Sequence, residues 1–590
     1  MPNKTLNSFK PVAFINISPE KKYPFIELNF SNVLKKFFKL NLEQKEILLN
    51  HTKKVFEDYF EFIDYKEENF PFEIFQNLIY EKVFVSVYVN NKMLISRVGD
   101  ETHNILVEIK SAVDKIIENK KFELINPEGK LLNFDIEICI FHNKQIVPLI
   151  NFKEVQKNIK LGIHAVEIEC NNRSAYYKEC VAVKHNWTLE KLLEKLSYKA
   201  ELNPDCFLEP NTMLYKYETQ TFRLFNNKVK EIYRHNTLTE QSAVNPQEIT
   251  RRLSLAAQWF KNNINQNTER LEYEYFPNKV AYSTSMNHVR ALATIWSMAQ
   301  LQNFLNNNSL SNLIETTLNY YLNYAIEGEN KEYIYLEVDD KGAKLCYNAF
   351  IIMTLIEYEK YSNTDELLNK LGQALLNAQT SNGSFNTVYG LDDITKGIDY
   401  YPGEIMLSLI KLYERTKDER YLEAVKKAFP FYRDYWRKNK NTAFVPWHSQ
   451  TYLILYKYFK SQELSDFVFE MTDWVINNYQ ILNSKYPDEL GGAPKRDPRN
   501  CAASWLEGIN DAYSLAVQVE DIKHIKKYKE SIEKGARFIM QLQFTEDNAF
   551  YEMPERLIGG FREAINKNCI RNDFVQHSIM ALMKFYKNSF

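Results

Sequence analysis

Glycine is scarce in this sequence. The chain has 16 glycines among 590 residues, too few for folds built from many tight turns, such as β-propellers and β-sandwiches. Helices are therefore expected to dominate at least part of the chain. Cysteine is sparse as well: the seven cysteines are scattered and form no Cys-x-x-Cys pair, so the sequence indicates neither a disulfide framework nor a zinc module. We expect no metal and no other cofactor.

The sequence also lacks a surplus of either charge and a long apolar run. Its 74 basic and 76 acidic side chains give a formal net charge of −2, whereas nucleic-acid-binding proteins usually carry a basic surplus. No stretch approaches the roughly 18 uninterrupted apolar residues of a membrane-spanning helix. The first residues, MPNKTLNSFKPVAF, do not resemble a secretory signal. We expect a cytoplasmic protein that binds neither nucleic acid nor a membrane.

The length predicts more than one domain, because 590 residues are too many for a single core. Residues 1–230 combine strand-like segments, such as KVFVSVYVN (82–90), with amphipathic helices, such as that at 188–202. They predict an α+β domain. The polar residues 231–246 are expected to form a linker that ends at Pro246, because proline is common in the first turn of a helix. Further elements are predicted at 102–122, 133–142 and 164–170.

Residues 247–590 are predicted to be all-α. About twelve segments show helical spacing of apolar residues, and they come in pairs joined by short polar turns such as RTKD (415–418). Six such hairpins can close into a ring, an (α/α)6 toroid; an open helical solenoid is the alternative. The predicted helices lie at 247–264, 286–306, 310–326, 343–361, 364–379, 403–416, 418–437, 448–461, 463–480, 500–519, 522–543 and 573–588.

The connections between these helices are unequal in length. Long connections precede the second, fourth, sixth, tenth and twelfth helices, whereas the turns within a hairpin are short. Long loops that gather on one rim of a packed scaffold usually build the functional site. The loop-rich rim, at the start of the inner helices, is therefore where we expect a site.

The first domain resembles the AMMECR-type family, a small α+β fold. The segments VFVSVYVNNKMLISRVGD, FDIEICIFHNKQIVPL and LYKYETQTF follow the family's order and spacing over about residues 40–225. The family's Leu-Arg-Gly-Cys-Ile-Gly motif falls on residues 94–99, where Arg97 replaces the cysteine, and a second cysteine position falls on Ser197. Without these thiols, chemistry with a thiolate nucleophile is excluded there. The departure from the motif favours a domain that is retained for binding, for docking a protein partner or for support of the fold.

The second domain looks like the (α/α)6 toroids of carbohydrate-active enzymes. The segment IDYYPGEIMLSLIKLYERTKDERYLEAVKKAF (398–429) resembles the glucuronyl epimerase and N-acylglucosamine epimerase-like group. The resemblance implies a toroid and an isomerase or epimerase that takes part in biosynthesis. The same motif recurs in toroids of different function, so it does not choose the reaction.

Polar and aromatic side chains stand in the first turns of the inner helices and in the loops before them. Acids, a base and a phenol are the groups that proton transfer requires. The candidate catalytic residues are Glu507, His577, Tyr401, Glu404 and Asp573. Arginines can hold an anion and aromatic rings can stack on sugar faces. The candidate substrate-binding residues are Arg562, Arg571, Arg499, Trp447, His448, Arg290 and Tyr400.

Two of these assignments have structural alternatives. Glu507 stands in the apolar run CAASWLEGI, where it acts either as a buried acid or as a strut bonded to a neighbouring helix. Asp573 either serves catalysis or caps its helix. Because His577 follows Asp573 by one turn, we expect that carboxylate to fix the tautomer of the imidazole. We also expect Arg562, Arg571, Asp573 and His577 to face the interior of the ring.

The rim favours an enzyme that acts on an anionic, carboxylated substrate, such as a sugar acid, by acid–base chemistry. Six helix N-termini converge there, each with a partial positive charge. An epimerase is the first hypothesis, because it needs two acid–base groups and cations for the carboxylate. A lyase or a hydrolase in the same pit is the second. The non-enzymatic alternative is a protein that binds a peptide or a small anion and docks a partner.

Overall fold

The computed structural model describes residues 39–60, 72–75, 78–123, 134–225, 227–339 and 342–590. Its contacts divide the chain into two compact units. The first comprises the residues up to Leu238 together with Phe550–Glu552, and the second comprises Thr239–Ala549 and Met553–Phe590. The division lies inside the stretch 231–246, whose first residues end a strand of the first unit.

The first unit is built on one antiparallel sheet. Its strands run in the order β2-β1-β3-β6-β4-β5. The short strand β7 pairs with the last residues of the long strand β6, from Thr221 to Phe225. The strands at 82–90, 133–142 and 164–170 are confirmed as β1, β3 and β4. The strands are β1 (Lys82–Val89), β2 (Lys92–Val98), β3 (Asp135–Ile146), β4 (His164–Cys170), β5 (Arg173–Tyr177), β6 (Met213–Phe225) and β7 (Lys228–Ile232).

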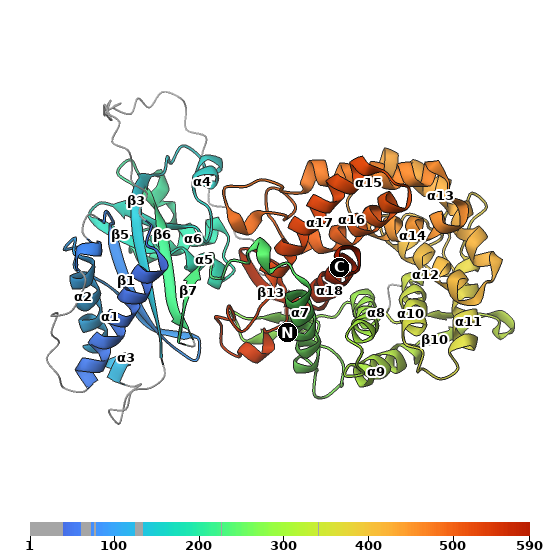
Figure 1. The fold of residues 1–590 in the computed structure, drawn as a ribbon, viewed down its shortest axis with the longest axis horizontal. Helices are drawn as coiled ribbons and strands as arrows, with labels where there is room; N and C mark the ends of the chain where they lie inside the picture. The colour runs from blue at the N-terminus through green and yellow to red at the C-terminus, as the bar shows by residue number, and fades with distance from the viewer. Residues whose placement is uncertain (1–38, 61–71, 76–77, 124–133, 226, 340–341) are drawn as a thin grey trace, which may run out of the picture. The chain divides into compact units, whose positions relative to one another are not determined.

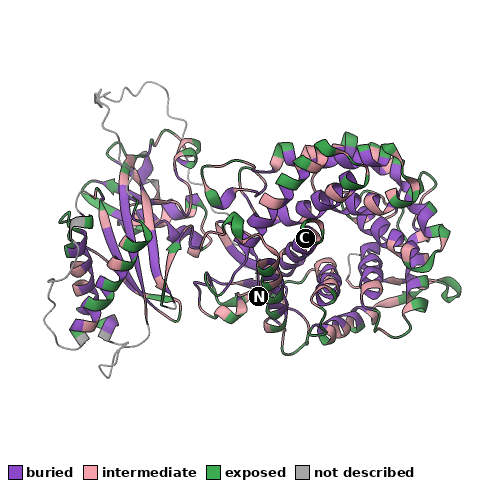
Figure 2. Ribbon diagram, viewed as in Figure 1, coloured by how far each residue is buried: buried purple, intermediate pink, exposed green. Residues whose placement is uncertain are grey.

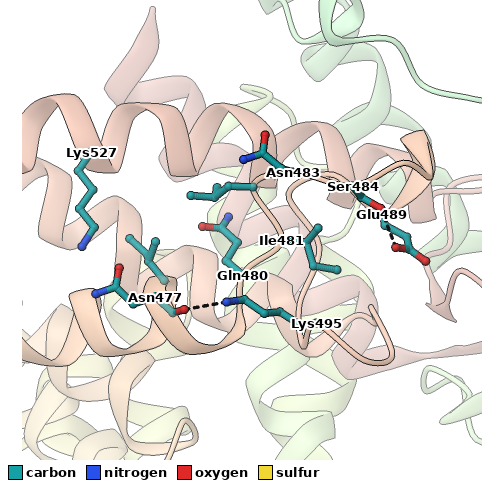
Figure 3. A pocket seen from close by; sticks show the side chains of 10 residues that line it. Asn477, Gln480, Ile481, Asn483, Ser484, Glu489, Lys495 and Lys527 are labelled. Atoms are coloured by element: carbon teal, nitrogen blue, oxygen red, sulfur yellow. Dashed lines mark hydrogen bonds between the residues drawn. The ribbon is translucent and has the colours of Figure 1, made fainter. Parts of the chain in front are cut away.

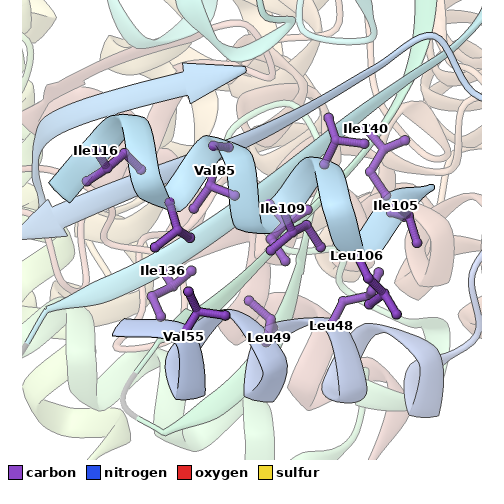
Figure 4. Close-up of a cluster of buried hydrophobic side chains, with 14 of the residues drawn as sticks. Leu48, Leu49, Val55, Val85, Ile105, Leu106, Ile109, Ile116, Ile136 and Ile140 are labelled. Atoms are coloured by element: carbon purple, nitrogen blue, oxygen red, sulfur yellow. The ribbon is translucent and has the colours of Figure 1, made fainter. Parts of the chain in front are cut away.

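Helices cover the sheet of the first unit and bury two apolar clusters. Figure 4 shows α1 and α2 with their leucine and isoleucine side chains interleaved over residues of β1 and β3. A second cluster lies between α4, α6 and the strands β4 and β6. The side chain of Asn104 begins α2 by accepting hydrogen bonds from the backbone N–H groups of Leu106 and Val107. The helices are α1 (Leu42–Phe60), α2 (Ile105–Ile117), α3 (Lys120–Glu123), α4 (Phe152–Asn158), α5 (Cys180–Lys184) and α6 (Leu189–Lys199).

The second unit has twelve α-helices among its described residues, and each coincides with a helix predicted from the sequence. This confirms the all-α prediction. Asn245 caps the first of them and Pro246 is its first residue. The helices are α7 (Pro246–Asn262), α8 (His288–Phe304), α9 (Ser311–Leu322), α10 (Leu345–Glu357), α11 (Thr364–Asn377), α12 (Tyr401–Thr416), α13 (Glu419–Lys438), α14 (Phe444–Phe459), α15 (Gln462–Tyr479), α16 (Cys501–Gln518), α17 (Ile522–Leu542) and α18 (Asn572–Ser589).

These helices close into a ring. Each even-numbered helix from α8 to α16 packs against the next even-numbered helix. The last of them, α18, packs against both α16 and α8. In Figure 1 the odd-numbered helices lie outside the even-numbered ones, and Figure 2 shows buried residues where the two layers meet. The fold is therefore the (α/α)6 toroid, and the open solenoid is excluded by the contact of the last inner helix with the first. None of the helices in the described part of the chain is long and apolar enough to cross a membrane.

The long connections also help to close the ring. The loop before α8 contains β8 (Glu274–Phe276) and β9 (Ala281–Tyr282), and the loop before α18 contains β12 (Arg562–Ala564) and β13 (Lys567–Arg571). These strands form one sheet in the order β12-β13-β8-β9. The last loop of the toroid is thereby hydrogen-bonded to its first loop. As expected, the turns inside the hairpins are short and the connections that lead into the inner helices are long, except before α14.

Candidate functional site

Two hollows of the second unit differ in whether their polar side chains are bonded to the protein or directed into the hollow. One, of about 550 Å³, lies beside the end of α15 and includes Lys495 and Glu489. Figure 3 shows two internal bonds of its polar side chains: Lys495 donates to the carbonyl of Asn477 at 2.8 Å, and Ser484 donates to Glu489 at 2.9 Å. Lys527 is paired with Asp473 at 2.8 Å. This hollow therefore has no acid–base pair directed into it.

The other hollow, called here the lumen pocket, lies at the N-terminal ends of the inner helices. Its volume is about 370 Å³, within the usual range of small-molecule sites. It combines carboxyl groups, an imidazole, a guanidinium and aromatic rings. The residues that line it are Asn287, Val289, Arg290, Ala293, Phe350, Tyr400, Tyr401, Glu404, Ala443, Pro446, Trp447, Ser504, Asp573, Gln576 and His577.

Glu404 is a buried acid at the edge of this pocket. It stands one turn into α12, and 4% of its surface is exposed. Its Oε2 atom has no hydrogen-bond partner among the residues that the structure describes. Burial raises the pKa of this carboxyl to about 8, because the charged form loses its hydration. Glu404 is therefore a neutral acid at pH 7 that can donate a proton into the pocket.

His577 is held by a carboxylate from the neighbouring helix. Its Nδ1 atom lies 2.7 Å from Oε1 of Glu507, which comes from α16 and is 1% exposed. His577 itself is in α18 and lines the pocket. If Nδ1 donates to Glu507, the lone pair of the imidazole is on Nε2, which is bonded to no described residue. The expectation that Asp573 fixes the tautomer is therefore wrong, because Glu507 occupies that position.

Asp573 is bound by two arginines. Arg571 donates to both of its oxygens, at 2.5 and 2.9 Å, and the Nε atom of Arg290 lies 3.0 Å from Oδ2. Arg290 also donates to the hydroxyl of Tyr273. These contacts raise the pKa of Arg571 against the opposing effect of its burial. Two cations thus share this carboxylate, and Glu274 lies close enough to act on both of them.

Aromatic side chains form the remaining wall. The ring of Trp447 packs against Phe350 at 5.7 Å and lies 6.1 Å from the ring of His577. Tyr400 and Tyr401 meet edge to face at 4.6 Å, and burial raises the pKa of both phenols. At neutral pH these tyrosines are therefore neutral hydrogen-bonding groups. Flat rings with hydroxyl groups suit the faces and edges of a sugar.

The orientation of the inner helices adds to the positive potential. All six begin toward the pocket, so the partial positive charges of their N-termini converge on it. Asn287 caps α8 by accepting a hydrogen bond from the N–H of Arg290. The N-cap side chains of the other five, all of them described, make no capping hydrogen bond. Such a convergence favours a bound anion.

Seven of the twelve residues named from the sequence line this one pocket, and five do not. The seven are Arg290, Tyr400, Tyr401, Glu404, Trp447, Asp573 and His577. Glu507 lies behind His577, and Arg571 lies behind Asp573. Arg499 pairs with Asp497 and lies 3.9 Å from Glu563, away from the lining.

The sequence-based assignment of His448 and Arg562 to substrate binding is wrong, because both are fully buried. His448 stacks on Phe444 and bonds to the carbonyl of that residue at 2.8 Å, and burial lowers the pKa of its imidazole to about 3. Arg562 lies in β12 with its guanidinium over the ring of Phe544. Neither residue faces the interior of the ring.

Other lining residues were missed from the sequence. Although polar side chains stand in its first turn, α10 contributes only Phe350 to the lining. Its Asn348 is buried and donates to the carbonyls of Ile334 and Leu371 instead. Gln576 and Ser504, by contrast, follow a helical spacing from recognised residues: they lie three positions after Asp573 and three before Glu507. That spacing is the signal that could have identified them.

The structure also places the two residues of the first unit, Arg97 and Ser197, that stand where the family has cysteine. Arg97 is in β2, and its Nη1 atom donates to the carbonyl of Ser96 at 3.0 Å. Ser197 is buried in α6 and donates to the carbonyl of Leu193 at 3.0 Å. The serine is therefore part of the core, whereas the arginine borders a hollow of the sheet.

The first unit matches a known family. The AMMECR1 family model covers residues 49–222, which confirms the resemblance noted in the sequence. A protein of Thermococcus gammatolerans is 28% identical over 117 residues, 19% of this chain and 55% of that protein. A protein of Methanothermobacter thermautotrophicus is 25% identical over 114 residues, 19% of this chain and 59% of that protein. The chain thus spans a little over half the length of these curated relatives.

Solved structures similar to the chain include two sugar-processing enzymes. A D-mannose isomerase is 12% identical, with a TM-score of 0.44, over 59% of this chain and 100% of that one. A family 76 glycoside hydrolase from a bovine Bacteroides thetaiotaomicron strain is 11% identical, with a TM-score of 0.44, over 77% of this chain and 96% of that one.

Proposed function

We propose that the second unit is an enzyme that moves a proton within a small, anionic, sugar-like substrate, as an epimerase or isomerase does. The lumen pocket is its active site. The observation that carries the proposal is that two unlike proton-transfer groups border one pocket. Glu404 is a neutral acid, and His577 offers the lone pair of an imidazole that Glu507 orients.

The chemistry begins at a carbon next to a carbonyl or carboxyl group. Nε2 of His577 removes the proton from this carbon, and the bonding electrons move toward the substrate's oxygen. Glu404 donates its proton to that oxygen as negative charge develops there, which forms an enediol. Protonation of the same carbon on its other face, by a second donor of the pocket such as the phenol of Tyr401, gives an epimer as Glu404 takes back the oxygen-bound proton and the carbonyl re-forms. Where the reacting carbon carries a hydroxyl, His577 can instead return the proton to the former carbonyl carbon while the carboxylate of Glu404 accepts the proton of that hydroxyl, which gives an isomer.

The surroundings of the pocket support an anionic substrate. Arg290 lines the pocket, and 37% of its side chain is exposed. The inner helices direct their N-termini to the same place, and together these groups stabilise a carboxylate or phosphate. Trp447 and Tyr400 offer rings for the sugar. Asp573 keeps Arg290 in position rather than reacting itself, because both of its oxygens already accept hydrogen bonds from guanidinium groups.

A hydrolase is the second candidate, because Glu404 and Asp573 are two carboxyl groups on one pocket. A glycoside hydrolase uses one neutral acid and one ionised carboxylate. The arginines on both oxygens of Asp573 disfavour this alternative, since a carboxylate that attacks carbon or activates water needs an accessible oxygen. Epimerisation or isomerisation therefore comes first.

One experiment distinguishes these reactions. Aldoses, uronic acids, N-acyl amino sugars and uronate-containing oligosaccharides are incubated with the full chain in deuterium oxide and followed by proton NMR. An epimerase or isomerase exchanges the proton on the carbon beside the carbonyl for deuterium. A lyase forms a double bond, and a hydrolase releases a new reducing end without exchange. Absence of exchange with every substrate that is turned over contradicts the proposal.

Matched variants test the assigned residues. His577→Asn and Glu404→Gln are each expected to lower kcat by about 100-fold or more while KM changes little, because they remove groups that act on the transition state. Glu507→Gln alters only the group behind the imidazole and is expected to shift the pH profile of kcat as well as its size. Glu414→Gln, a partly exposed position of the same helix α12 paired with Lys457, is the control. Full activity in both His577→Asn and Glu404→Gln contradicts the assignment.

A further inference from the structure

The first unit has a hollow of its own, of about 490 Å³. It is called here the sheet pocket. Residues of β1, β2, β5, α5 and α6 line it, together with the residues beside them. All of them belong to the first unit. None takes part in the proton-transfer chemistry assigned to the second unit.

The charge around the sheet pocket is one-sided. Its lining includes Arg97, Lys178, Lys184 and Lys199 but no aspartate or glutamate. Lys178 is compensated from behind by Glu137, whose Oε1 atom lies 2.8 Å from Nζ. The other three cations form no ion pair with a described residue: Arg97 and Lys199 donate only to backbone carbonyls, at 3.0 and 2.7 Å. Three cations therefore border one hollow without an ion-pair partner among the described residues, although the charge of Glu137 also acts on Lys184.

Flat rings form another part of the same lining. The imidazole of His185 stacks on Trp187 with ring centroids 4.9 Å apart and an interplanar angle of 23°. Tyr177 meets Trp187 edge to face at 5.9 Å, and the ammonium group of Lys199 lies 4.7 Å from the centre of the Tyr177 ring. Cations held beside aromatic faces favour a ligand that has a planar ring and a negative charge.

The ionisable groups indicate binding rather than catalysis. Burial raises the pKa of the Cys180 thiol to about 12, so this lining sulfur is a neutral thiol and a poor nucleophile at pH 7. Burial also lowers the pKa of the Lys184 and Lys199 ammonium groups. For Lys184 the nearby Cys180 and Glu137 oppose that effect, and the charges of Lys178 and Arg223 add to it. An anion that enters the pocket would stabilise these cations.

We propose that the sheet pocket is a second ligand site, which binds a small anion that carries a planar ring, such as a phosphate or carboxylate of roughly mononucleotide size. The anionic group pairs with Arg97, Lys184 and Lys199, and the ring packs against the aromatic wall at Trp187. Lys178 is not needed as an ion-pair partner, because Glu137 already satisfies it.

Isothermal titration calorimetry of the full chain tests this proposal with four probes. Adenosine 5′-monophosphate has the ring and a phosphate, 4-hydroxybenzoate has a ring and a carboxylate, adenosine has the ring alone, and inorganic phosphate has the charge alone. At least one of the first two is expected to bind about tenfold more tightly than both adenosine and phosphate, and less tightly as salt is added. Comparison of the first two distinguishes phosphate from carboxylate recognition.

Variants connect the binding to the pocket. Lys184→Gln and Arg97→Gln are each expected to weaken the tightest probe by about fivefold or more, since each removes an uncompensated charge. Lys153→Gln, at an exposed position of α4 outside the pocket, is the matched control. Trp187→Phe is expected to retain binding but to abolish the change in tryptophan fluorescence that the probe causes in the first unit, where Trp187 is the only tryptophan.

Three results would overturn the proposal. One is the absence of binding by both ring-bearing anions at concentrations up to about 5 mM. Another is equal affinity for adenosine and its monophosphate together with no affinity for 4-hydroxybenzoate, which would mean that the charge is not recognised. The third is unchanged affinity in both folded variants, Lys184→Gln and Arg97→Gln, as judged by circular dichroism.

Discussion

Replacing Glu404 by glutamine should change how the stability of the second unit depends on pH. In the folded protein the pKa of this carboxyl is raised to about 8, and its usual value is 4.5. Below the usual value the carboxyl is neutral in both the folded and the unfolded chain. As the pH rises from there toward 8, the unfolded chain releases the proton and the folded chain retains it, so the wild type loses free energy of unfolding. Glutamine has no proton to lose and removes this contribution.

The size of the effect follows from the two pKa values. Each pH unit between them costs about 1.4 kcal/mol, and the loss ends above the folded pKa, where both states are ionised. From about pH 5 to pH 7 the wild type should therefore lose roughly 2.5 kcal/mol that the Glu404→Gln variant retains. The difference between the two proteins isolates Glu404 from other groups that titrate in the same range, among them Asp511, whose pKa burial raises to about 6.

Urea unfolding followed by tryptophan fluorescence measures this difference. Only Trp187 of the seven tryptophans lies in the first unit, so the signal reports mainly on the toroid. The wild type, Glu404→Gln and the control Glu414→Gln are compared at pH values from about 5 to 8. If the wild type and Glu404→Gln keep a constant difference across this range, Glu404 ionises at its ordinary pH and is not the neutral acid of the proposed mechanism.

Further predictions concern the same site and the closure of the ring. The kcat of the proposed reaction should fall as the pH rises through about 8, because Glu404 must hold its proton to donate it; a flat profile across that value in the wild type speaks against this role. Asp573→Asn should lower the free energy of unfolding by about 1–3 kcal/mol, since Arg571 and Arg290 lose their shared carboxylate, and urea titration measures the loss. His448→Leu should leave kcat within about twofold of the wild type per folded molecule, because His448 is buried and neutral; a large loss of kcat would restore it as a site residue. A chain that ends before α18 should lose cooperative unfolding, since α8 and α16 lose the helix that joins them, and a soluble truncated chain that still unfolds cooperatively would refute the closure.

Local patterns in the sequence determined the elements of this protein. Apolar residues at helical spacing located all twelve helices of the toroid, an apolar β-branched run located β1, and alternation with a period of two located β3 and β4. Polar residues in the first turns of the inner helices pointed to the lumen pocket, and Glu404, Asp573 and His577 do line it. These features are readable because they depend on neighbours within a few positions of the chain.

Only the tertiary structure decided which of those side chains meet and which are buried. Glu507 and His577 are 70 positions apart, and their contact exists because α16 packs against α18. Burial makes Glu404 a neutral acid, and burial also removes His448 and Arg562 from the pocket. In each case the burial depends on the neighbouring helices and loops that cover the side chain. The single sign of charge in the sheet pocket likewise arises from cations of β2, α5 and α6 that converge only in the folded unit. Burial and long-range pairing are properties of the packed chain, and periodicity along the sequence carries no record of them.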